Sequence, residues 1–314
     1  MIWLTWRQHR VRILVTIGLV VAYGIFLLVD GLANGRVVAD ALVNPTFQGP
    51  WPSVPEDVTN RVLQTRQVIG YVGLVPALIG MFWGAPVISR EFELGTQRMA
   101  WTQSVSRLRW LTTKLSTLSV LAAVVGLAIG AITSTWVDVY QGTSLGQRFS
   151  SGSLFGASGI VPMAWCAAGF LIGAAAGAFT RKMLPAMAMA LAVLLGFVVL
   201  LNGFAREYYA APERVVSEIG DLTGIARDEI SVETTYTGPD GREIDTTEFR
   251  TNGVCADVVG SSRDCFANAG YRKVDYVHPA DRYWRFQLTE TGLLLLVGLG
   301  AAGYAVRRTI RHNA

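Results

Sequence analysis

Two acidic residues and several basic ones lie close together in a short stretch between two long apolar runs. This stretch, residues 89–114, places Glu91 and Glu93 directly before Gly95 and Thr96, a composition typical of a turn followed by a helix start. Charged groups of both signs can bind a complementary partner protein or pair with each other. We therefore consider two interpretations of segment 89–114: a docking element that transmits force to the flanking helices, or an ordinary charged loop.

The flanking runs belong to a set of six windows that contain no Asp, Glu, Lys or Arg. Of the 314 residues, 51% are apolar and only 16% are charged. A helix that crosses the hydrocarbon core needs about 20 mostly apolar residues. We therefore predict an all-α polytopic membrane protein with six transmembrane helices. The windows are residues 13–29, 67–89, 115–137, 149–180, 183–205 and 291–306.

Positive charge is concentrated on one side of the predicted membrane. With six spans, both termini lie on the same side, and this side carries thirteen cations but only two carboxylates, Glu91 and Glu93. Because Lys and Arg in short loops resist translocation, we predict an N-in, C-in topology. Nucleic-acid binding is disfavoured, since the cations are dispersed over four short segments. The cations are Arg7, Arg10, Arg12, Arg90, Arg98, Arg107, Arg109, Lys114, Arg181, Lys182, Arg307, Arg308 and Arg311.

The polar regions divide the chain further. Residues 1–205 hold the first five spans, and 287–314 hold the sixth span and a cytoplasmic tail. We predict a small α+β extracytoplasmic domain over residues 206–286. Its expected hairpin pairs an alternating run at 230–236 with a strand at 244–249, and its expected helix covers 213–225. The outer loop at 30–66 should be turn-rich in its first half and helical in its second.

The cysteines fit this arrangement. Cys255 and Cys265 both lie in the predicted outer domain, whereas Cys166 lies within the fourth span. An oxidising compartment permits a disulfide between Cys255 and Cys265. A metal site is the alternative, although two thiols ten positions apart, with His278 nearby, make a poor set of ligands.

No window has an ionisable side chain near its middle, which argues against a proton-driven or sodium-driven carrier. None of the three lysines follows a glycine, as a P-loop requires, and the chain has no HExxH motif. We therefore expect a protein that is not an enzyme, and energy for any movement of the spans must come from another chain. A helix over 97–103, capped by Thr96, and a second helix, capped by Ser104 or Ser106, would make segment 89–114 the place where that energy enters.

The order of residues in this segment resembles the inner loop of ABC exporter permeases of the type-2 class. The matching features are an acidic stretch, Gly95-Thr96, and a short helix that ends in the Ser-x-Ser-Arg sequence of 104–107. The opening residues 3–10, Trp-Leu-Thr-Trp-Arg-Gln-His-Arg, are similar to the N-terminal surface helix of the same family. The match covers the membrane part of the chain but not residues 206–286.

The resemblance implies a membrane pathway built from two permease copies, expected as a homodimer, in the lipid bilayer of a bacterial cell membrane. Two cytoplasmic ABC ATPase subunits would bind ATP and Mg, so this chain itself needs no cofactor. Segment 89–114 would be the coupling element, and export would be the direction of transport. The resemblance assigns ATPase docking to Glu91, Glu93, Gly95, Thr96, Gln103 and Arg107. Local pairing of the two carboxylates with Arg90 or Arg98 is the alternative.

Small residues recur every four positions in two spans. Such spacing lets helix backbones approach closely, either within one subunit or between two, and a substrate path along these faces is the alternative. A second functional hypothesis is a membrane anchor or sensor that transports nothing and uses residues 206–286 for recognition. The repeated glycines are Gly126 and Gly130 in the third span, and Gly169, Gly173 and Gly177 in the fourth.

Overall fold

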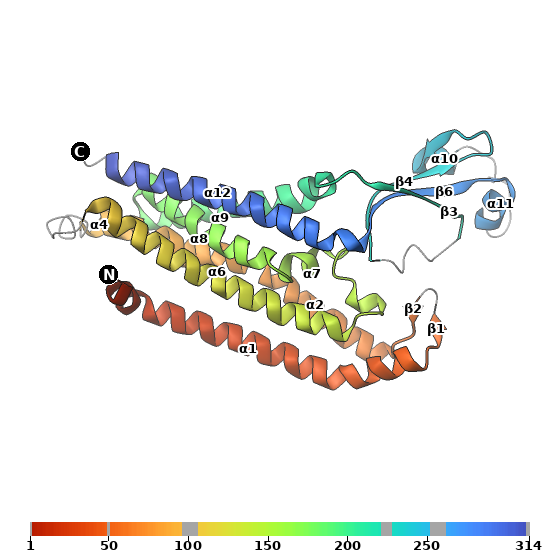
Figure 1. The fold of residues 1–314 in the computed structure, drawn as a ribbon, viewed down its shortest axis with the longest axis horizontal. Coiled ribbons are helices and arrows are strands. Elements are labelled where there is room, and N and C mark those ends of the chain that lie inside the picture. The colour runs from red at the N-terminus through yellow and green to blue at the C-terminus, as the bar shows by residue number, and fades with distance from the viewer. Residues whose placement is uncertain (1, 49–50, 96–105, 221–227, 252–261, 312–314) are drawn as a thin grey trace.

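The structure is a computed structural model that describes residues 2–48, 51–95, 106–220, 228–251 and 262–311. Long helices run side by side along the longest axis of the molecule (Figure 1). Both ends of the chain lie at one end of this bundle, which we call the terminal end. A small β-sheet lies beyond the other end, which we call the sheet end (Figure 1).

Six helical stretches in the described residues are long and apolar enough to cross a membrane, which confirms the predicted number of spans. The second and fifth are built from several consecutive helical pieces, and the others are mainly single helices. The six stretches are Arg10–Val43, Glu56–Leu94, Leu108–Val139, Val161–Thr180, Met183–Tyr208 and Ala280–Arg311.

The first helix is longer than its uncharged window. Helix α1 covers Ile2–Val43, so the prediction of a turn-rich loop directly after residue 29 was wrong. Asp30 does not end the helix, because its carboxylate accepts hydrogen bonds from other helices. The helix ends just before Pro45, whose ring disfavours helical geometry in the residue that precedes it. Short strands β1 (Phe47–Gln48) and β2 (Trp51–Pro52) follow.

The second span is broken near its middle. Helix α2 (Glu56–Val72), which confirms the helical second half of the loop, is separated from α3 (Val75–Ile79) by Gly73 and Leu74. Pro76 has no N–H, so it cannot donate the helical hydrogen bond to the carbonyl of Val72. A π-helical turn, η1 (Gly80–Gly84), then leads into α4 (Ala85–Leu94).

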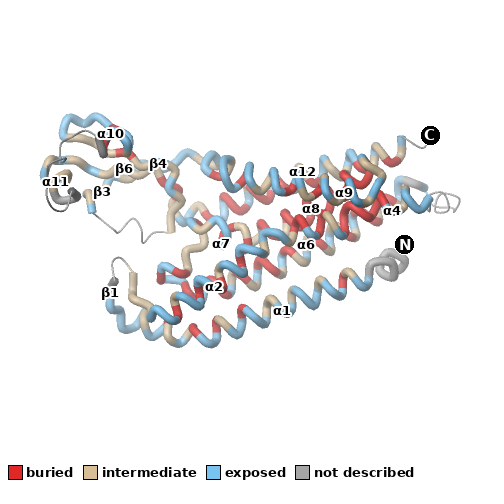
Figure 2. The backbone as a smooth tube through the Cα atoms, turned by 180° about the vertical axis from the view of Figure 1, so that it is seen from behind, coloured by how far each residue is buried: buried red, intermediate tan, exposed pale blue. Residues whose placement is uncertain are grey.

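The fourth span is a single helix that lies at the centre of the bundle. In the most apolar window of that span 89% of the residues are buried, against 11% for the first span (Figure 2). The fourth span therefore packs against other helices of the chain, whereas most of the first span is not covered by the rest of the described chain. The helices of the bundle after α4 are α6 (Arg107–Val139), α7 (Gly152–Ala157), α8 (Val161–Thr180), α9 (Met183–Leu200), η3 (Leu201–Ala205), η4 (Arg206–Tyr208) and α12 (Tyr283–Arg311).

The glycines of the third span face the start of α8. A Cβ atom on Gly126 would lie 2.2 Å from the carbonyl oxygen of Pro162, and one on Gly130 would lie 2.1 Å from that of Gly159. Real Cβ atoms do not approach so closely, so no side chain fits at either position.

The glycines of α8 contact the broken second span in the same way. Their backbones lie against carbonyl oxygens of α3, η1 and α4, and this contact runs from Gly169 to Gly177. The contacts lie within one chain, so they fix the second span against the central helix. A Cβ atom would lie 2.5 Å from the oxygen of Pro76 at Gly169, 2.1 Å from that of Gly80 at Gly173, and 2.4 Å from that of Ala85 at Gly177.

The polar region between α9 and α12 forms a four-stranded antiparallel sheet of order β3-β6-β4-β5. The strands are β3 (Glu213–Glu218), β4 (Ile230–Thr237), β5 (Glu243–Asp245) and β6 (Arg272–His278), with helices α10 (Thr246–Thr251) and α11 (Ser262–Asn268). The predicted hairpin is confirmed, but its second strand ends early. Asp245 Oδ1 accepts hydrogen bonds of 2.7 Å from the N–H groups of Thr247 and Glu248, which starts α10.

The prediction of a helix over residues 213–225 was wrong for residues 213–218. These residues form β3, in which Val215 and Val216 pair with Asp275 and Val274 of β6. The valines favour a strand, and β6 supplies the hydrogen-bonding edge that a local pattern does not show. Residues 221–227 lie outside the described part of the chain.

One carboxylate links this region to the bundle. Asp228, two residues before the start of β4, accepts hydrogen bonds from the N–H groups of Arg148 (2.9 Å), Phe149 (3.0 Å) and Ser150 (2.8 Å). A carboxylate that accepts several N–H groups fixes the local backbone. The sheet is therefore anchored to the loop between α6 and α7.

Replacement of Gly173 by alanine tests the backbone contact with η1. We expect the free energy of unfolding to fall by about 1–3 kcal/mol, because the added Cβ overlaps the carbonyl of Gly80. Gly196→Ala in α9 is the matched control, since nothing lies within 4 Å of its Cβ position. Thermal unfolding of the purified protein measures both changes. Equal stability of the two variants would contradict the close contact.

Candidate functional site

Segment 89–114 begins on α4 and ends on α6. Gly95 ends α4 in the left-handed conformation (φ 67°), which glycine adopts without strain. Ser106 caps α6, because its hydroxyl accepts a hydrogen bond of 3.3 Å from the N–H of Arg109, and this confirms one of the two predicted caps. Arg107 is the first residue of α6. Thr96 and Gln103, with the predicted helix between them, lie outside the described residues.

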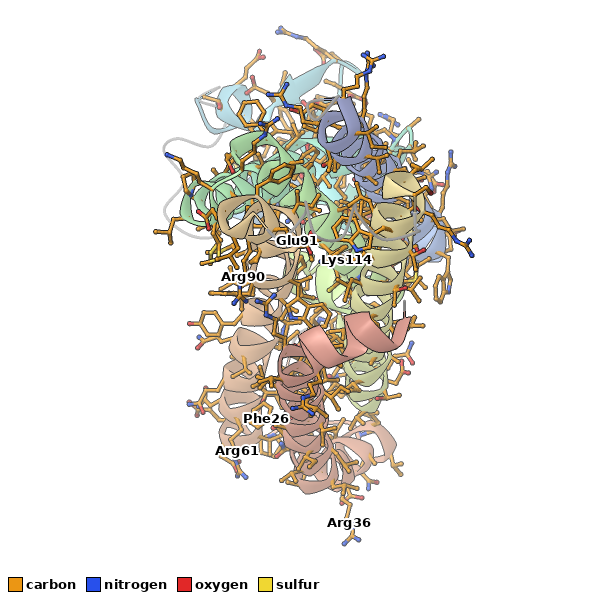
Figure 3. The ribbon with its side chains drawn as sticks, turned by 90° about the vertical axis from the view of Figure 1, so that its left-hand side faces the viewer. Phe26, Arg36, Arg61, Arg90, Glu91 and Lys114 are labelled. Atoms are coloured by element: carbon orange, nitrogen blue, oxygen red, sulfur yellow. The ribbon has the colours of Figure 1, made fainter. Side chains whose placement is uncertain are left out.

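Glu91 forms an ion pair with Lys114, which joins the last turn of α4 to α6 at the terminal end (Figure 3). The lysine is buried, and its ammonium also lies 3.5 Å from the carbonyl oxygen of Val87 and 5.2 Å from the centre of the Trp110 ring. Breaking an ion pair in a buried position leaves a charge without compensation and is costly. The two ends of segment 89–114 are therefore held together by a strong contact.

Glu93 contacts a different helix. Its Oε1 atom accepts a hydrogen bond of 2.9 Å from the N–H of Met183, the first residue of α9. A carboxylate at this position satisfies a free N–H group and interacts favourably with the helix dipole. The neighbouring Phe92 ring lies 5.3 Å from the Arg181 guanidinium. The end of α4 is thus attached to the turn between α8 and α9.

These partners differ from the local ones that we considered. In the described part of the chain, neither carboxylate pairs with Arg90, and Arg98 lies outside that part. The partner of Glu91 lies 23 positions away and that of Glu93 lies 90 positions away. No local spacing could have indicated either contact.

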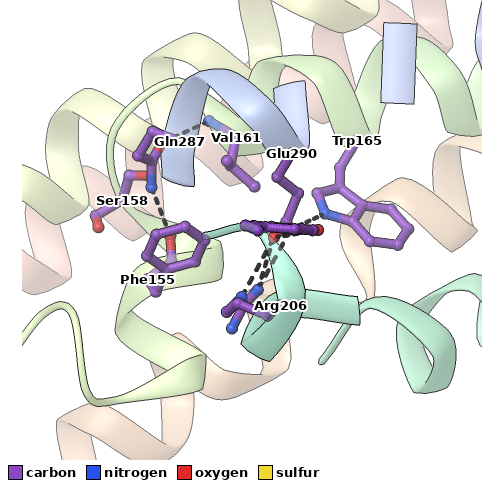
Figure 4. A network of polar contacts seen from close by, with 8 residues as sticks. Phe155, Ser158, Val161, Trp165, Arg206, Gln287 and Glu290 are labelled. Carbon is purple, nitrogen blue, oxygen red and sulfur yellow. Dashed lines mark hydrogen bonds and ion pairs between the residues drawn. The ribbon is translucent and has the colours of Figure 1, made fainter. Parts of the chain in front are cut away.

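A second charged cluster lies at the sheet end (Figure 4). Arg206 Nη2 lies 3.0 Å from Glu290 Oε2, and both side chains are buried, the glutamate completely. Trp165 Nε1 donates a hydrogen bond of 3.2 Å to the other oxygen of Glu290. The Phe155 ring centre lies 4.2 Å from the guanidinium carbon. The cluster therefore compensates a buried carboxylate with a cation and a neutral donor, and it joins α8, η4 and α12.

Tyr209 completes this cluster. Its hydroxyl lies 3.5 Å from Glu290 Oε2. Burial raises the pKa of Tyr209, and the nearby negative charge of Glu290 raises it further. The phenol therefore stays protonated at neutral pH and remains a hydrogen-bond donor.

Gln287 lies one turn before Glu290 and caps the central helix. Its Oε1 atom accepts hydrogen bonds from the N–H groups of Ile160 (2.9 Å) and Val161 (3.0 Å), at the start of α8. Its Nε2 atom donates to the carbonyl oxygens of Phe155 (3.1 Å) and Ser158 (3.3 Å). A buried amide with all these partners fixes α7 and α8 against α12.

A third polar group joins the first three spans. Asp30 on α1 accepts hydrogen bonds from Trp136 Nε1 (2.7 Å), the Tyr140 hydroxyl (2.8 Å) and the Thr65 hydroxyl (3.0 Å). Burial raises the pKa of Tyr140, and its hydrogen bond to Asp30 raises it further. The tyrosine thus remains a donor to the carboxylate.

Nothing in the described residues forms a metal site, since no group of three or more His, Cys, Asp or Glu side chains could hold an ion. Cys166 is a free thiol buried in α8. Cys265 lies on α11 and Cys255 lies outside the described residues, so their disulfide remains a prediction.

The buried pair at the sheet end makes a prediction about stability. Glu290→Gln leaves the buried Arg206 without a counter-charge, and we expect a loss of about 3–5 kcal/mol in the free energy of unfolding. Asp57→Asn is the control, because its ion pair with Arg61 is exposed and should contribute less than about 1 kcal/mol. Thermal unfolding in detergent compares the two variants. Similar losses in the two variants would show that the buried Glu290–Arg206 pair contributes no more to the free energy of unfolding than an exposed ion pair.

Comparison with known proteins supports the membrane architecture. Residues 17–206, more than half of the chain, match the family described as ABC-2 membrane transporter related. The match begins within the first apolar helix and ends at Arg206, near the end of the fifth. No curated protein and no solved structure gave a significant match. The chain therefore belongs to the ABC-2 membrane transporter related family.

Proposed function

We propose that this multi-pass membrane protein is the permease subunit of an ATP-driven exporter, coupled to a separate cytoplasmic ATPase through segment 89–114. Membership of an ABC-2 family implies a transport role in the membrane and an ATPase partner. The observation that carries the proposed coupling is the Glu91–Lys114 ion pair, which joins both sides of the segment.

The contacts of this segment support a mechanism of force transmission. An ATPase that pushes on the segment would move α4 and α6 together, because the buried ion pair resists their separation. Glu93 would pass the movement to α9 through the N–H of Met183. In this proposal both carboxylates act by holding the helix ends together, and Thr96, Gln103 and Arg107 remain candidates for direct contact with the ATPase.

The break in the second span supports a mechanism in which this span bends. The interruption at Gly73 and Leu74 separates α2 from α3, and η1 inserts a π-turn farther along. Breaks and π-turns within a span are places where a helix can bend. Displacement of α4 at the terminal end would be absorbed there, while α8 serves as the fixed support.

The proposal includes the orientation and the assembly. The terminal end faces the cytoplasm, in agreement with its excess of cations over carboxylates, and the sheet faces outward. Two copies of the chain form the pathway in a bacterial cell membrane with two ATPase subunits, which bind ATP and Mg. The Cys255–Cys265 disulfide would form on the outer side, where oxidation is permitted.

Two substitutions within segment 89–114 test the coupling. Glu93→Gln removes the charge at the start of α9, and Gly95→Ala places a side chain in a left-handed conformation, each at a cost of about 1 kcal/mol. We expect each to lower permease-stimulated ATP hydrolysis about fivefold, the factor that corresponds to this energy. The measurement is hydrolysis by the co-purified complex.

Glu56→Gln at the start of α2 is the matched control, because this residue lies at the other end of the second span. Its hydrolysis should equal that of the unaltered complex. Unchanged hydrolysis in both test variants, with the complex intact, would contradict the coupling role of segment 89–114.

A further inference from the structure

A cavity of about 600 Å³ lies between α1, the second span, α6 and the start of α9. We call it the α1 groove. Its lining is apolar apart from three side chains of α1, namely Arg12, Thr16 and Tyr23. The volume is within the range of about 300–1,000 Å³ that is usual for sites that bind small molecules.

Two of the three polar side chains already have partners. The Thr16 hydroxyl donates a hydrogen bond of 2.9 Å to the carbonyl oxygen of Arg12, and the Tyr23 hydroxyl shares one of 2.8 Å with Thr133. The guanidinium of Arg12 is therefore the polar group of the groove that is left to bind a ligand.

Arg12 is half-buried, and none of the ion pairs formed among the described residues includes it. Its charge is repelled by Arg90, which lies on α4 four positions after the groove-lining Pro86. A half-buried cation beside a second cation is unfavourable unless an anion lies near both. The terminal end of the α1 groove thus favours a negative group.

The remainder of the groove favours an apolar chain. Val15 is 57% exposed, Leu19 66% and Phe82 51%, so its walls are open between the helices at the depth of a membrane span. A ligand with one anionic end and a long apolar body matches this distribution.

We propose that the α1 groove binds an anionic amphiphile from the surrounding leaflet, with its acyl chain between α1 and the second span and its headgroup near Arg12 and Arg90. A second cavity, of about 380 Å³, lies on the other side of the break in the second span. The two cavities share Val72, Val75 and Ile129, so a chain in the groove reaches the break itself.

This inference rests on the proposed exporter function in one respect, since it names the substrate class of that exporter. Binding itself requires neither nucleotide nor ATPase. If the complex fails to couple, the exporter proposal fails but the binding result is unchanged. If the complex couples but binds no anionic lipid, only the proposed lipid site is contradicted.

The headgroup is tested with phosphatidylglycerol and phosphatidylcholine of the same acyl chains. Each lipid is added to the purified full-length protein in detergent, and bound lipid is counted by native mass spectrometry. We expect preferential binding of phosphatidylglycerol, and a loss of about fivefold in Arg12→Gln, the effect of about one interfacial cation. Arg10→Gln, exposed on the same helix and outside the groove, should bind as the unaltered protein does.

The acyl-chain site is tested by filling the groove. Val15→Trp places a large side chain in it, whereas Leu14→Trp adds the same side chain at a neighbouring position that is equally exposed and does not line the groove. We expect Val15→Trp to lose phosphatidylglycerol binding and Leu14→Trp to retain it.

Three results would overturn the site. Equal binding of the two lipids would exclude an anionic headgroup site. Equal losses in Arg10→Gln and Arg12→Gln would indicate general attraction to the basic surface. Equal behaviour of Leu14→Trp and Val15→Trp would show that the acyl chain lies elsewhere.

Discussion

A charge that lies in or beside the hydrocarbon layer must have a partner, and the structure depends on how this chain meets that requirement. At the terminal end the partner of Glu91 is Lys114, and at the sheet end the partner of Glu290 is Arg206. The first pair joins α4 to α6 across segment 89–114, and the second joins η4 to α12, 84 positions apart. The need to compensate charge therefore determines which helix ends are attached to one another. Arg12 has no such partner among the described residues, and for that reason we assign it to a ligand.

Between the two charged ends, the glycines bring the backbone of α8 into direct contact with the backbone of the second span. The glycines of α8 lie against carbonyl oxygens of the second span, so α8 and the pieces of that span pack with little free space. Close-packed helices transmit displacement because they have few voids into which to relax. The break at Gly73 and Leu74 interrupts the helix of the second span, and it lies where the two apolar cavities meet. In the proposed mechanism, a push at the terminal end would therefore change the shape of the groove without unfolding α8.

The spans could be predicted because bilayer thickness imposes a length on apolar windows, and the β4–β5 hairpin because its turn residues are local in sequence. The helical extension of α1 past Asp30 could not be predicted, because it depends on hydrogen bonds donated by Trp136 and Tyr140. Strand β3 could not be predicted either, because it depends on pairing with the edge of β6. The composition of segment 89–114 marked Glu91 and Glu93 as unusual carboxylates among cations. Their partners are set by tertiary register, which no periodicity in this sequence reports.

The most direct test of the coupling account is an exchange of the two charges at the terminal end. ATP hydrolysis by the co-purified complex, normalised to folded permease, is measured for Glu91→Lys, for Lys114→Glu and for the double variant. The account predicts a loss of about tenfold or more in each single variant, because each places like charges together in a buried position, and substantial recovery in the double variant. Full hydrolysis in both single variants, or a double variant no better than either, would contradict it.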